Sequence, residues 1–226
     1  MKKHIALCAV VLVFGGMEQS MATPVFHGPI HYQSQADIPA GFYASGSPTG
    51  LEDFEDLSLD FGITASAGSA IGPGGLTDSV DGDDGSIDGS GTNGHSFFSG
   101  SGATGIKFTF SSPVTAAGIV WTDGAGTTTF EAFGPGDTSL GTIGPVLVAT
   151  SGITGQTDED SFFGVTDLGG ITAIKLSNTS GGIEIDHVQF GDAAVGNAVP
   201  EPATVALLGL GLAGLGFGCR KRPCEG

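Results

Sequence analysis

The chain has 226 residues, a mean hydropathy of +0.22 and a formal net charge of −17. Residues 23–198 contain 21 of the 24 acidic residues and two of the seven basic ones, Lys107 and Lys175, so this segment has a net charge of −19. Such a charge keeps a protein dispersed, attracts divalent cations and repels nucleic acid and anionic lipid headgroups. We therefore expect no nucleic-acid partner.

Residues 1–22 have the composition of a signal peptide. A basic start precedes an apolar run at residues 5–16, and Ser20 and Ala22 are small residues at the two positions that signal peptidase reads. An uncleaved N-terminal anchor is the alternative, but about twelve apolar residues are few for a membrane span. The sequence predicts cleavage between Ala22 and Thr23 and export of the remainder.

The exported segment lacks cysteine, because all three cysteines lie outside residues 23–198. It cannot rely on disulfides, so a hydrophobic core or a bound metal ion must stabilise it. About 150 residues suffice for one such core. We expect one folded domain at residues 51–191, with an N-terminal segment at 23–50 and a linker at 192–198.

Apolar residues in this segment alternate with polar ones, and helical periodicity is missing. Ile106, Phe108 and Phe110, for example, alternate with Lys107 and Thr109, as in a strand with one buried face. Glycine, aspartate and proline separate the alternating runs, which is typical of an all-β sandwich without helical crossovers. The predicted strands are 61–67, 106–110, 117–122, 127–133, 145–150, 161–165, 171–176 and 183–190.

Residues 78–94 alternate aspartate with glycine, serine and asparagine. Carboxylates and carbonyls in such a loop can surround Ca²⁺. The EF-hand register fails, because placing Gly85 at the sixth position puts Val80 and Gly82 where carboxylates are needed. A solvated acidic loop is the first interpretation, and an irregular Ca²⁺ loop is the alternative.

The last predicted strand changes parity. Ile183 and Ile185 share one face, whereas the apolar side chains within 188–190 fall on the other. A bulge near Asp186 and His187 would return both pairs to the core, and it would also re-aim Asp186.

Three segments, 54–56 (Phe-Glu-Asp), 105–110 and 185–190 (Ile-Asp-His-Val-Gln-Phe), resemble a jelly-roll, galactose-binding-like domain. Such domains are common in bacterial surface proteins and carbohydrate-binding modules. The resemblance covers residues 51–191 and implies a jelly-roll β-sandwich.

The same resemblance implies a structural Ca²⁺. In many such modules an acidic residue near the first strand and an aspartate in the last strand share the ion. Because Ca²⁺ takes about six to eight oxygen ligands, backbone carbonyls and another carboxylate would complete the shell. The matching positions in this chain are Glu52, Glu55 and Asp186.

Enzyme chemistry has little support in the sequence. The histidines of the exported segment lack the spacing of a metal centre, and no cysteine nucleophile, Gly-x-Ser-x-Gly elbow or P-loop occurs there. Neighbouring carboxylates at 52–53, 55–56 and 158–160 could serve a glycosidase, although acidic turns explain them as well. We interpret His95 and His187 as strand-edge residues and expect no enzyme.

Sugar binding would use exposed aromatic rings. Trp121, Tyr32 and Tyr43 are the amphipathic candidates. Trp121 is in phase with Ile119, which favours a place in the core instead. The sequence assigns no ligand-binding residue.

The C-terminal segment has three parts. An apolar stretch at 203–219 follows a motif that consists of Pro200, Glu201 and Pro202. At about 1.5 Å per residue, a helix of this length is roughly 27 Å long, close to the ~30 Å of a bilayer core. We expect a transmembrane helix whose cytoplasmic end is marked by Arg220, Lys221 and Arg222.

This order of parts resembles the PEP-CTERM sorting signal of bacterial envelope proteins, over residues 199–222. The resemblance implies that an exosortase, a membrane-embedded protease-transpeptidase, acts at the Pro-Glu-Pro motif after a transient stage in the inner membrane. The protein would then move to the cell surface or exopolysaccharide. Residues 223–226 extend past the usual basic end. A permanent single-span anchor is the alternative.

The sequence therefore indicates an exported surface or matrix protein with a structural or adhesive role. The first alternative is a Ca²⁺-dependent carbohydrate-binding module, which an exposed aromatic ring beside carboxylates would favour. The second is an extracellular glycan-active enzyme, which a cleft with two carboxyl groups about 5 to 10 Å apart would favour. The expected partners are signal peptidase, exosortase and extracellular polysaccharide.

Overall fold

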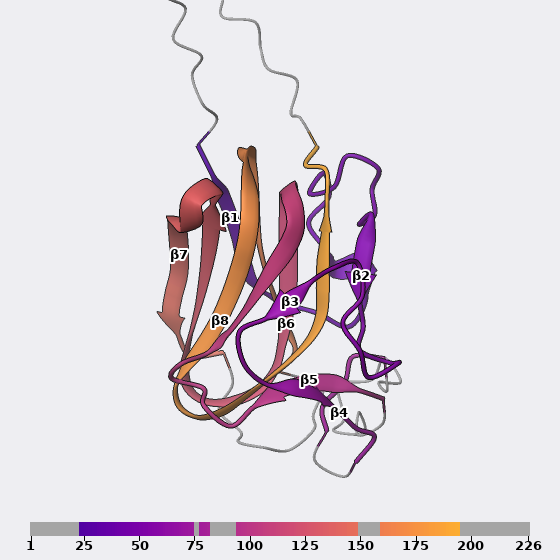
Figure 1. Cartoon of the computed structure of the whole chain (residues 1–226), viewed down its shortest axis with the longest axis vertical. Helices are drawn as coiled ribbons and strands as arrows, with labels where there is room; N and C mark the ends of the chain where they lie inside the picture. The colour runs from indigo at the N-terminus through magenta and orange to yellow at the C-terminus, as the bar shows by residue number, and fades with distance from the viewer. Residues whose placement is uncertain (1–22, 75–76, 82–93, 149–158, 195–226) are drawn as a thin grey trace, which may run out of the picture.

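The structure is a computed structural model that describes residues 23–74, 77–81, 94–148 and 159–194. The described residues form a curled antiparallel sheet, and the all-β sandwich class predicted from the sequence is confirmed (Figure 1). Its elements are β1 (Val25–His31), the 3₁₀ turn η1 (Gln35–Asp37), β2 (Gly50–Glu52), β3 (Thr64–Ala65), β4 (Ser69–Ile71), β5 (Ser96–Ser99), β6 (Ile106–Gly134), the 3₁₀ turn η2 (Pro135–Asp137), β7 (Thr138–Val146) and β8 (Ser161–Gly191).

Two long strands, β6 and β8, form most of the sandwich. Each bends twice, so that its middle part pairs with both ends of the other strand. Ile174, in the middle of β8, lies opposite Phe108 in the first part of β6 and opposite Ala132 in its last part. The middle of β6 pairs with both ends of β8 in the same way. Each long strand thus provides three arms, which correspond to the predicted strands at 106–110, 117–122 and 127–133 in β6 and at 161–165, 171–176 and 183–190 in β8.

The short strands extend the edges of these arms. β1 pairs with the first arm of β8, β2 and β5 pair with its last arm, and β4 pairs with β5. β3 and β7 pair with the first and last arms of β6. Because β1 lies in the sheet and Tyr43 forms a bridge with Ala193, the folded unit is wider than the predicted 51–191 and includes the segment at 23–50.

Two predicted strands differ from the structure. The run at 61–67 contributes only the short β3, because Phe61 and Gly62 have positive φ angles that interrupt an extended backbone. The strand predicted at 145–150 lies earlier in the chain, as β7, and its last two residues fall outside the described residues. Alternation had located both runs, but it did not reveal where the backbone turns.

The main core lies between the layers of the sandwich and contains Phe108, Trp121, Phe130 and Phe163. The side chain of Trp121 is 1% exposed, and its Nε1 donates a hydrogen bond to Asn178 Oδ1 at 3.1 Å. The core position predicted for this tryptophan is therefore confirmed.

A second apolar cluster covers the outer face of one layer. Neighbouring strand residues point to opposite faces of a sheet. Trp121 and Phe163 therefore point into the main core, whereas Val120 and Phe162 point to the outer face. The N-terminal segment packs over that outer face. The buried members of this outer cluster are Tyr32, Phe42, Tyr43, Val80, Ala116, Val120, Phe162 and Ala193.

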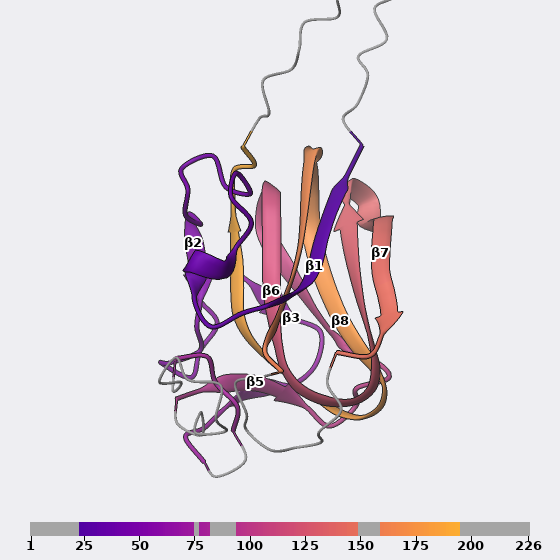
Figure 2. The same ribbon diagram turned by 180° about the vertical axis from the view of Figure 1, so that it is seen from behind.

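The two ends of the sandwich differ. The start of β1 and the last described residues lie at one end, whereas β4 and β5 cross the other end (Figures 1 and 2). We call the end with β4 and β5 the far end.

Candidate functional site

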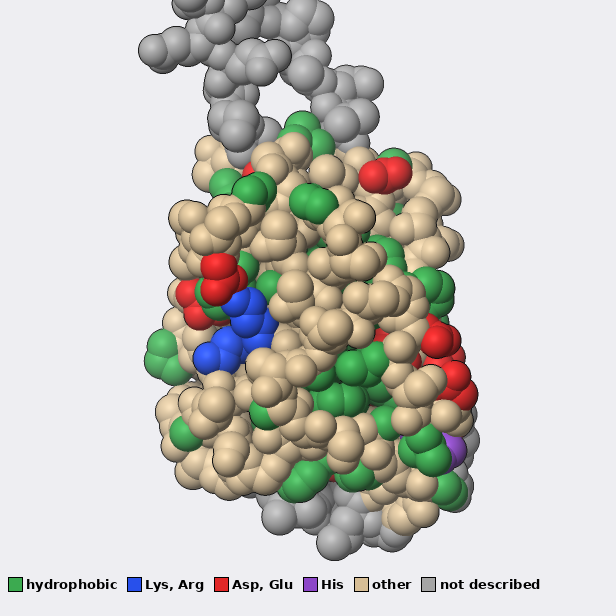
Figure 3. Space-filling view, viewed as in Figure 1, with side chains coloured by type: hydrophobic (Ala, Val, Ile, Leu, Met, Phe, Trp, Pro, Cys, Tyr) green, Lys and Arg blue, Asp and Glu red, His purple; other side chains and the backbone are tan. Residues whose placement is uncertain are grey.

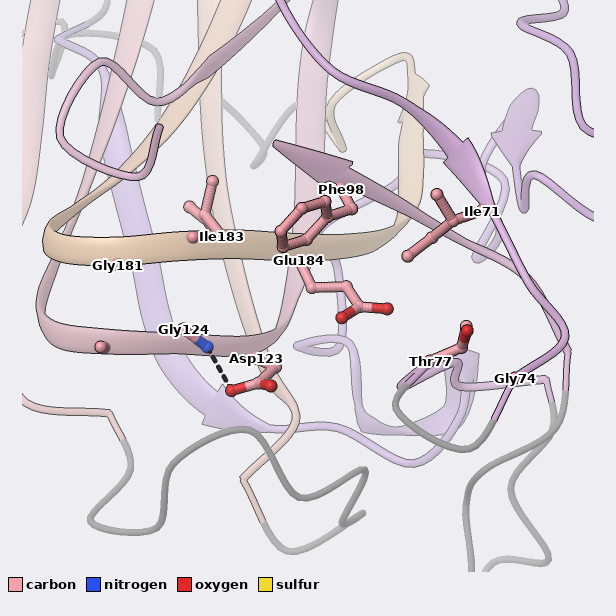
Figure 4. Close-up of a pocket in the computed structure, with 11 residues that line it drawn as sticks. Ile71, Gly74, Thr77, Phe98, Asp123, Gly124, Gly181, Ile183 and Glu184 are labelled. Atoms are coloured by element: carbon pink, nitrogen blue, oxygen red, sulfur yellow. Dashed lines mark hydrogen bonds between the residues drawn. The ribbon is translucent and has the colours of Figure 1, made fainter. Parts of the chain in front are cut away.

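A pocket of about 550 Å³ opens at the far end of the sandwich, within the size range of small-molecule sites. β4 and β5 form one side of the pocket, and the turns that follow the middle arm of β6 and precede the last arm of β8 form the other (Figure 4). Its lining includes Ile71, Thr77, Phe98, Asp123, Ile183 and Glu184.

Two carboxylates line the pocket side by side. Asp123 and Glu184 are directly opposite one another on β6 and β8, a position at which side chains are neighbours. Glu184 Oε1 accepts hydrogen bonds from the backbone N–H of Asp78, at 3.0 Å, and from the Ser96 hydroxyl. Asp123 Oδ1 accepts from the N–H of Gly124 at 2.5 Å (Figure 4). Each side chain is thus held in place while carboxylate atoms face the pocket.

Burial raises the pKa of both pocket carboxyl groups. For Glu184, hydrogen bonds from Ser96 and Asp78 oppose the rise, and the charge of Asp123 adds to it. For Asp123, the hydrogen bond from Gly124 opposes the rise. Burial is thus the main cause of the raised pKa at both groups.

An aromatic ring stands beside these carboxylates. Phe97 and Phe98 are neighbours on β5, so Phe97 enters the main core while Phe98 points outward and is 38% exposed. A Cβ atom at Gly182 would lie 2.7 Å from the Phe98 ring. The glycine therefore makes room for the ring at the pocket.

A second polar group lies on the outer face and consists of Asp81, Asp186 and His187; we call it the histidine cluster. Its potential ligand atoms all lie within 4.8 Å of one another. His187 Nε2 is 3.1 Å from Asp81 Oδ2, and His187 Nδ1 is 3.0 Å from the Tyr32 hydroxyl. Asp186 is fully buried and His187 is 4% exposed, whereas the Asp81 side chain is 40% exposed.

The β-bulge predicted at Asp186 and His187 is present. Asp186 lies opposite Val120 and Gln189 lies opposite Gly118, so three steps on β8 match two on β6. His187 has a φ of 44°. Ile183, Ile185, Val188 and Phe190 all pack in or against the main core as a result. The interpretation of His187 as a strand-edge residue is wrong, because the bulge turns it into the outer cluster.

Burial raises the pKa of Asp186 to about 7, although the charge of His187 and the hydrogen bonds from the His187 and Val80 N–H groups oppose the rise. Burial alone would lower the pKa of His187, but the carboxylates of Asp186, Asp81 and Asp53 raise it above the ordinary value. Two buried ionisable groups thus share one site.

The three predicted Ca²⁺ ligands have different partners in the structure. Glu52 is buried and accepts hydrogen bonds from the N–H of Phe54, at 3.0 Å, and from the N–H of Asp60. Glu55 is on the surface and contacts the His95 backbone and ring, the latter at 3.0 Å. Asp186 belongs to the histidine cluster, so the structure brings it together with Asp81 rather than with Glu52 and Glu55. The assignment of Ca²⁺ to those residues stays a prediction.

The acidic segment at 78–94 is described only in part. Residues 78–80 are buried against β8, where Glu184 and Asp186 accept hydrogen bonds from Asp78, Ser79 and Val80. This part of the segment is therefore not a solvated loop. Residues 82–93 lie outside the described residues.

The aromatic residues proposed for sugar stacking are all buried. Trp121 is in the main core, and Tyr32 and Tyr43 belong to the outer cluster. Sequence reasoning missed the pocket residues Phe98, Asp123 and Glu184. The alternation around Phe97 and Phe98 could have indicated one outward ring, but no local pattern places β5 beside the last arm of β8.

The predicted signal cleavage site at Ala22 and Thr23, the Pro-Glu-Pro motif and the span at 203–219 are outside the described residues, apart from Thr23 itself. Within the described ranges, no helix is long and apolar enough to cross a membrane. No curated protein matches the chain significantly, and no solved structure does. Residues 198–222 match the PEP-CTERM protein-sorting motif. The motif implies that this chain is exported, processed at the membrane by an exosortase and sorted to the cell surface.

Proposed function

We propose that the chain is an adhesive protein of the cell surface or extracellular matrix and that it binds a neutral saccharide in the pocket at the far end. The observation that carries this proposal is the exposed Phe98 ring beside Asp123 and Glu184. The sorting motif supports the location, because it implies sorting to the cell surface.

The pocket has the two kinds of group that a sugar ring requires. The apolar C–H face of a pyranose packs on an aromatic ring, while its hydroxyl groups donate hydrogen bonds to acceptors at the ring edge. Phe98 and Ile71 provide the apolar surface, and the carboxyl oxygens of Asp123 and Glu184 provide acceptors (Figure 4). Acceptors held by their own hydrogen bonds lose little conformational freedom on binding.

The charge of the protein favours a neutral saccharide over an anionic one. A net charge of −19 in residues 23–198 repels uronate and sulfate groups. In the space-filling view the two described lysines lie together on one flank, at about mid-height (Figure 3). Lys107 forms an ion pair with Asp137 and lies 3.9 Å above the Phe133 ring, so its charge is engaged.

We propose binding without hydrolysis. A glycosidase assigns one carboxyl group as acid and the other as base or nucleophile, which needs environments that push their pKa values apart. Here burial raises both pKa values, and one oxygen of each group is already hydrogen-bonded. These hydrogen bonds hold each carboxyl group in place, which suits it to accept a hydrogen bond from a saccharide hydroxyl.

A glycan array with the full chain in mild detergent tests the proposal. We expect binding to neutral glycans, and Phe98→Ala should weaken it at least about 5-fold, because aromatic contacts contribute about 1 kcal/mol or more. Phe61→Ala is the matched control, since Phe61 is 51% exposed but does not line the pocket. Release of reducing ends, measured on the bound glycans, should stay at background.

Three results would contradict the proposal: no glycan bound, equal binding by wild type and Phe98→Ala, or an equal loss in Phe61→Ala. The same array run with chelator, Ca²⁺ or Mg²⁺ tests the calcium-dependent alternative. Binding that chelator abolishes and that Ca²⁺ restores, but Mg²⁺ does not, would favour that alternative.

A further inference from the structure

The histidine cluster combines features that an ordinary buried ion pair does not require. His187 Nε2 is buried without an assigned hydrogen bond, and Asp81 Oδ2 lies 3.1 Å away as its ion-pair partner. A buried nitrogen without a hydrogen bond costs about 1 to 3 kcal/mol. Within the described residues, the ion pair with Asp81 is the contact that compensates the burial of this nitrogen.

The distance between Asp81 and His187 is compatible with two ligands on one metal ion. A zinc ion lies about 2.0 to 2.1 Å from each nitrogen or oxygen ligand, so two ligand atoms at tetrahedral angles are roughly 3.3 Å apart. The metal, not the second ligand, then lies along the lone pair of the ring nitrogen. The measured 3.1 Å separation between His187 Nε2 and Asp81 Oδ2 fits this arrangement.

The bulge brings consecutive residues to the same point. In a regular strand Asp186 and His187 would point to opposite faces of the sheet. With φ of 44° at His187, both side chains instead lie within one cluster of ligand atoms. Bulges often re-aim side chains at functional positions.

The surrounding residues orient each ligand. Tyr32 contacts His187 Nδ1 at 3.0 Å, and when that nitrogen carries the proton, Nε2 has its lone pair free for a metal. Asp186 accepts hydrogen bonds from its neighbour's N–H at 2.6 Å, from Val80 N at 2.9 Å and from Ser79 Oγ at 3.1 Å. Such second contacts are typical of metal ligands.

We propose that Asp81, Asp186 and His187 bind a divalent transition metal ion of the zinc class. One imidazole nitrogen and two carboxylates suit zinc, whereas Ca²⁺ prefers about six to eight oxygens. Three protein ligands leave one position of a tetrahedral zinc ion for water, and the 40% exposure of the Asp81 side chain gives solvent access to the cluster. The ion would cross-link residues 77–81 to β8 in a domain that contains no cysteine and hence no disulfide.

The histidine cluster is separate from the proposed saccharide pocket, but both contact the segment at residues 77–81. Thr77 lines the pocket, and residues 78–80 are hydrogen-bonded to Glu184 and Asp186. A metal that fixes this segment also fixes one wall of the pocket. Metal binding is measured without any glycan, so failure of either proposal can be recognised independently.

Metal titration of the full chain in mild detergent tests the proposal. Thiolates bind zinc tightly, so Cys8, Cys219 and Cys224 are first replaced by serine. After chelator treatment, Zn²⁺ is titrated against a chromophoric indicator, and thermal unfolding is followed by the fluorescence of the single tryptophan. We expect one Zn²⁺ per chain, a higher unfolding temperature, and a smaller response to Ca²⁺ or Mg²⁺ at equal ionic strength.

Variants assign the ligands. His187→Gln and Asp81→Asn should each weaken Zn²⁺ binding by about 100-fold or more, and Tyr32→Phe by about 10-fold, as expected for an orienting partner. Asp81 is exposed enough that Asp81→Asn tests the site even where His187→Gln fails to fold. His95→Gln is the matched control, because His95 also pairs with a carboxylate at 3.0 Å but outside the cluster.

The proposal is overturned if Zn²⁺ binds no better than Mg²⁺, or if Asp81→Asn binds Zn²⁺ as tightly as the parent chain. A loss in His95→Gln equal to that in Asp81→Asn would also overturn it, because the binding would then be distributed over the surface. A chain stabilised by Ca²⁺ alone, with an effect abolished by Glu55→Gln, would favour the predicted Ca²⁺ site in its place.

Discussion

The buried Asp186 makes stability fall as pH rises, in the metal-free protein. Its pKa is about 7 in the folded chain against 3.8 for an ordinary aspartate. A group with a raised folded pKa stabilises the fold below the unfolded pKa, and this stability is lost as pH rises through the folded pKa. About three pKa units at 1.36 kcal/mol each correspond to roughly 4 kcal/mol, of which about 3 kcal/mol is lost between about pH 5 and pH 8.

Other groups act in the same direction. Burial also raises the pKa of Glu184, Asp123 and Glu52, and nearby carboxylates raise that of His187. Two groups have a lowered pKa and oppose the loss of stability with rising pH. Hydrogen bonds from Ser58 lower the pKa of Asp56 at the surface, and burial lowers the pKa of the half-buried His27. The sum therefore keeps the sign set by Asp186.

Urea unfolding of the full chain at about pH 5 and about pH 8, with chelator present, measures this effect. Tryptophan fluorescence reports unfolding, because the single tryptophan is in the main core. Asp186→Asn is the control and should flatten the pH dependence, since it removes the titrating group. Stability that is constant or that increases between the two pH values would refute the reasoning, and so would an equally steep loss in Asp186→Asn.

Further outcomes are expected from other parts of the chain. Trp121→Phe should cost about 2 kcal/mol in urea unfolding, because it removes the hydrogen bond to Asn178. Glu52→Gln should lower the free energy of unfolding by about 2 kcal/mol, because the N–H of Phe54 or of Asp60 would then face an amide NH₂ group in place of a carboxylate oxygen. An unchanged urea midpoint would contradict this prediction. Replacing residues 220–222 with neutral residues should leave unprocessed chain in the membrane, visible as a larger species on immunoblots. N-terminal analysis of the surface form should begin at Thr23, and recovery of the original N-terminus would exclude cleavage there.

The arms of β6 and β8 could be predicted because alternation reports which residues are buried. Phe108 and Ile174, for example, follow the period of two, and both are buried. Alternation does not report which arms pair. The sequence therefore divided the two long strands correctly into arms but could not show that each folds back on the other.

The candidate sites depend on contacts between distant residues, which explains why they were missed. Asp186 was singled out for its bulge, and the bulge is present, but its neighbour Asp81 is 105 positions earlier in the chain. The position of Glu184 beside Asp123 likewise follows from a pairing that no local pattern encodes. The local sequence pattern predicted the strand at 183–190 and its bulge. The contacts with Asp81 and Asp123 became visible only in the three-dimensional structure.

The C-terminal end of the folded domain and the candidate pocket lie at opposite ends of the sandwich. The last described residue is Ala194, and the sorting motif begins at residue 198. Four residues reach at most about 14 Å, so the processed segment starts close to the end of the sandwich that carries Ala194. The pocket is lined by residues of β4 and β5, and these two strands cross the far end (Figure 1). A chain held by its C-terminal part can therefore present Phe98 and the two carboxylates away from its point of attachment. This orientation is consistent with the saccharide binding that we propose.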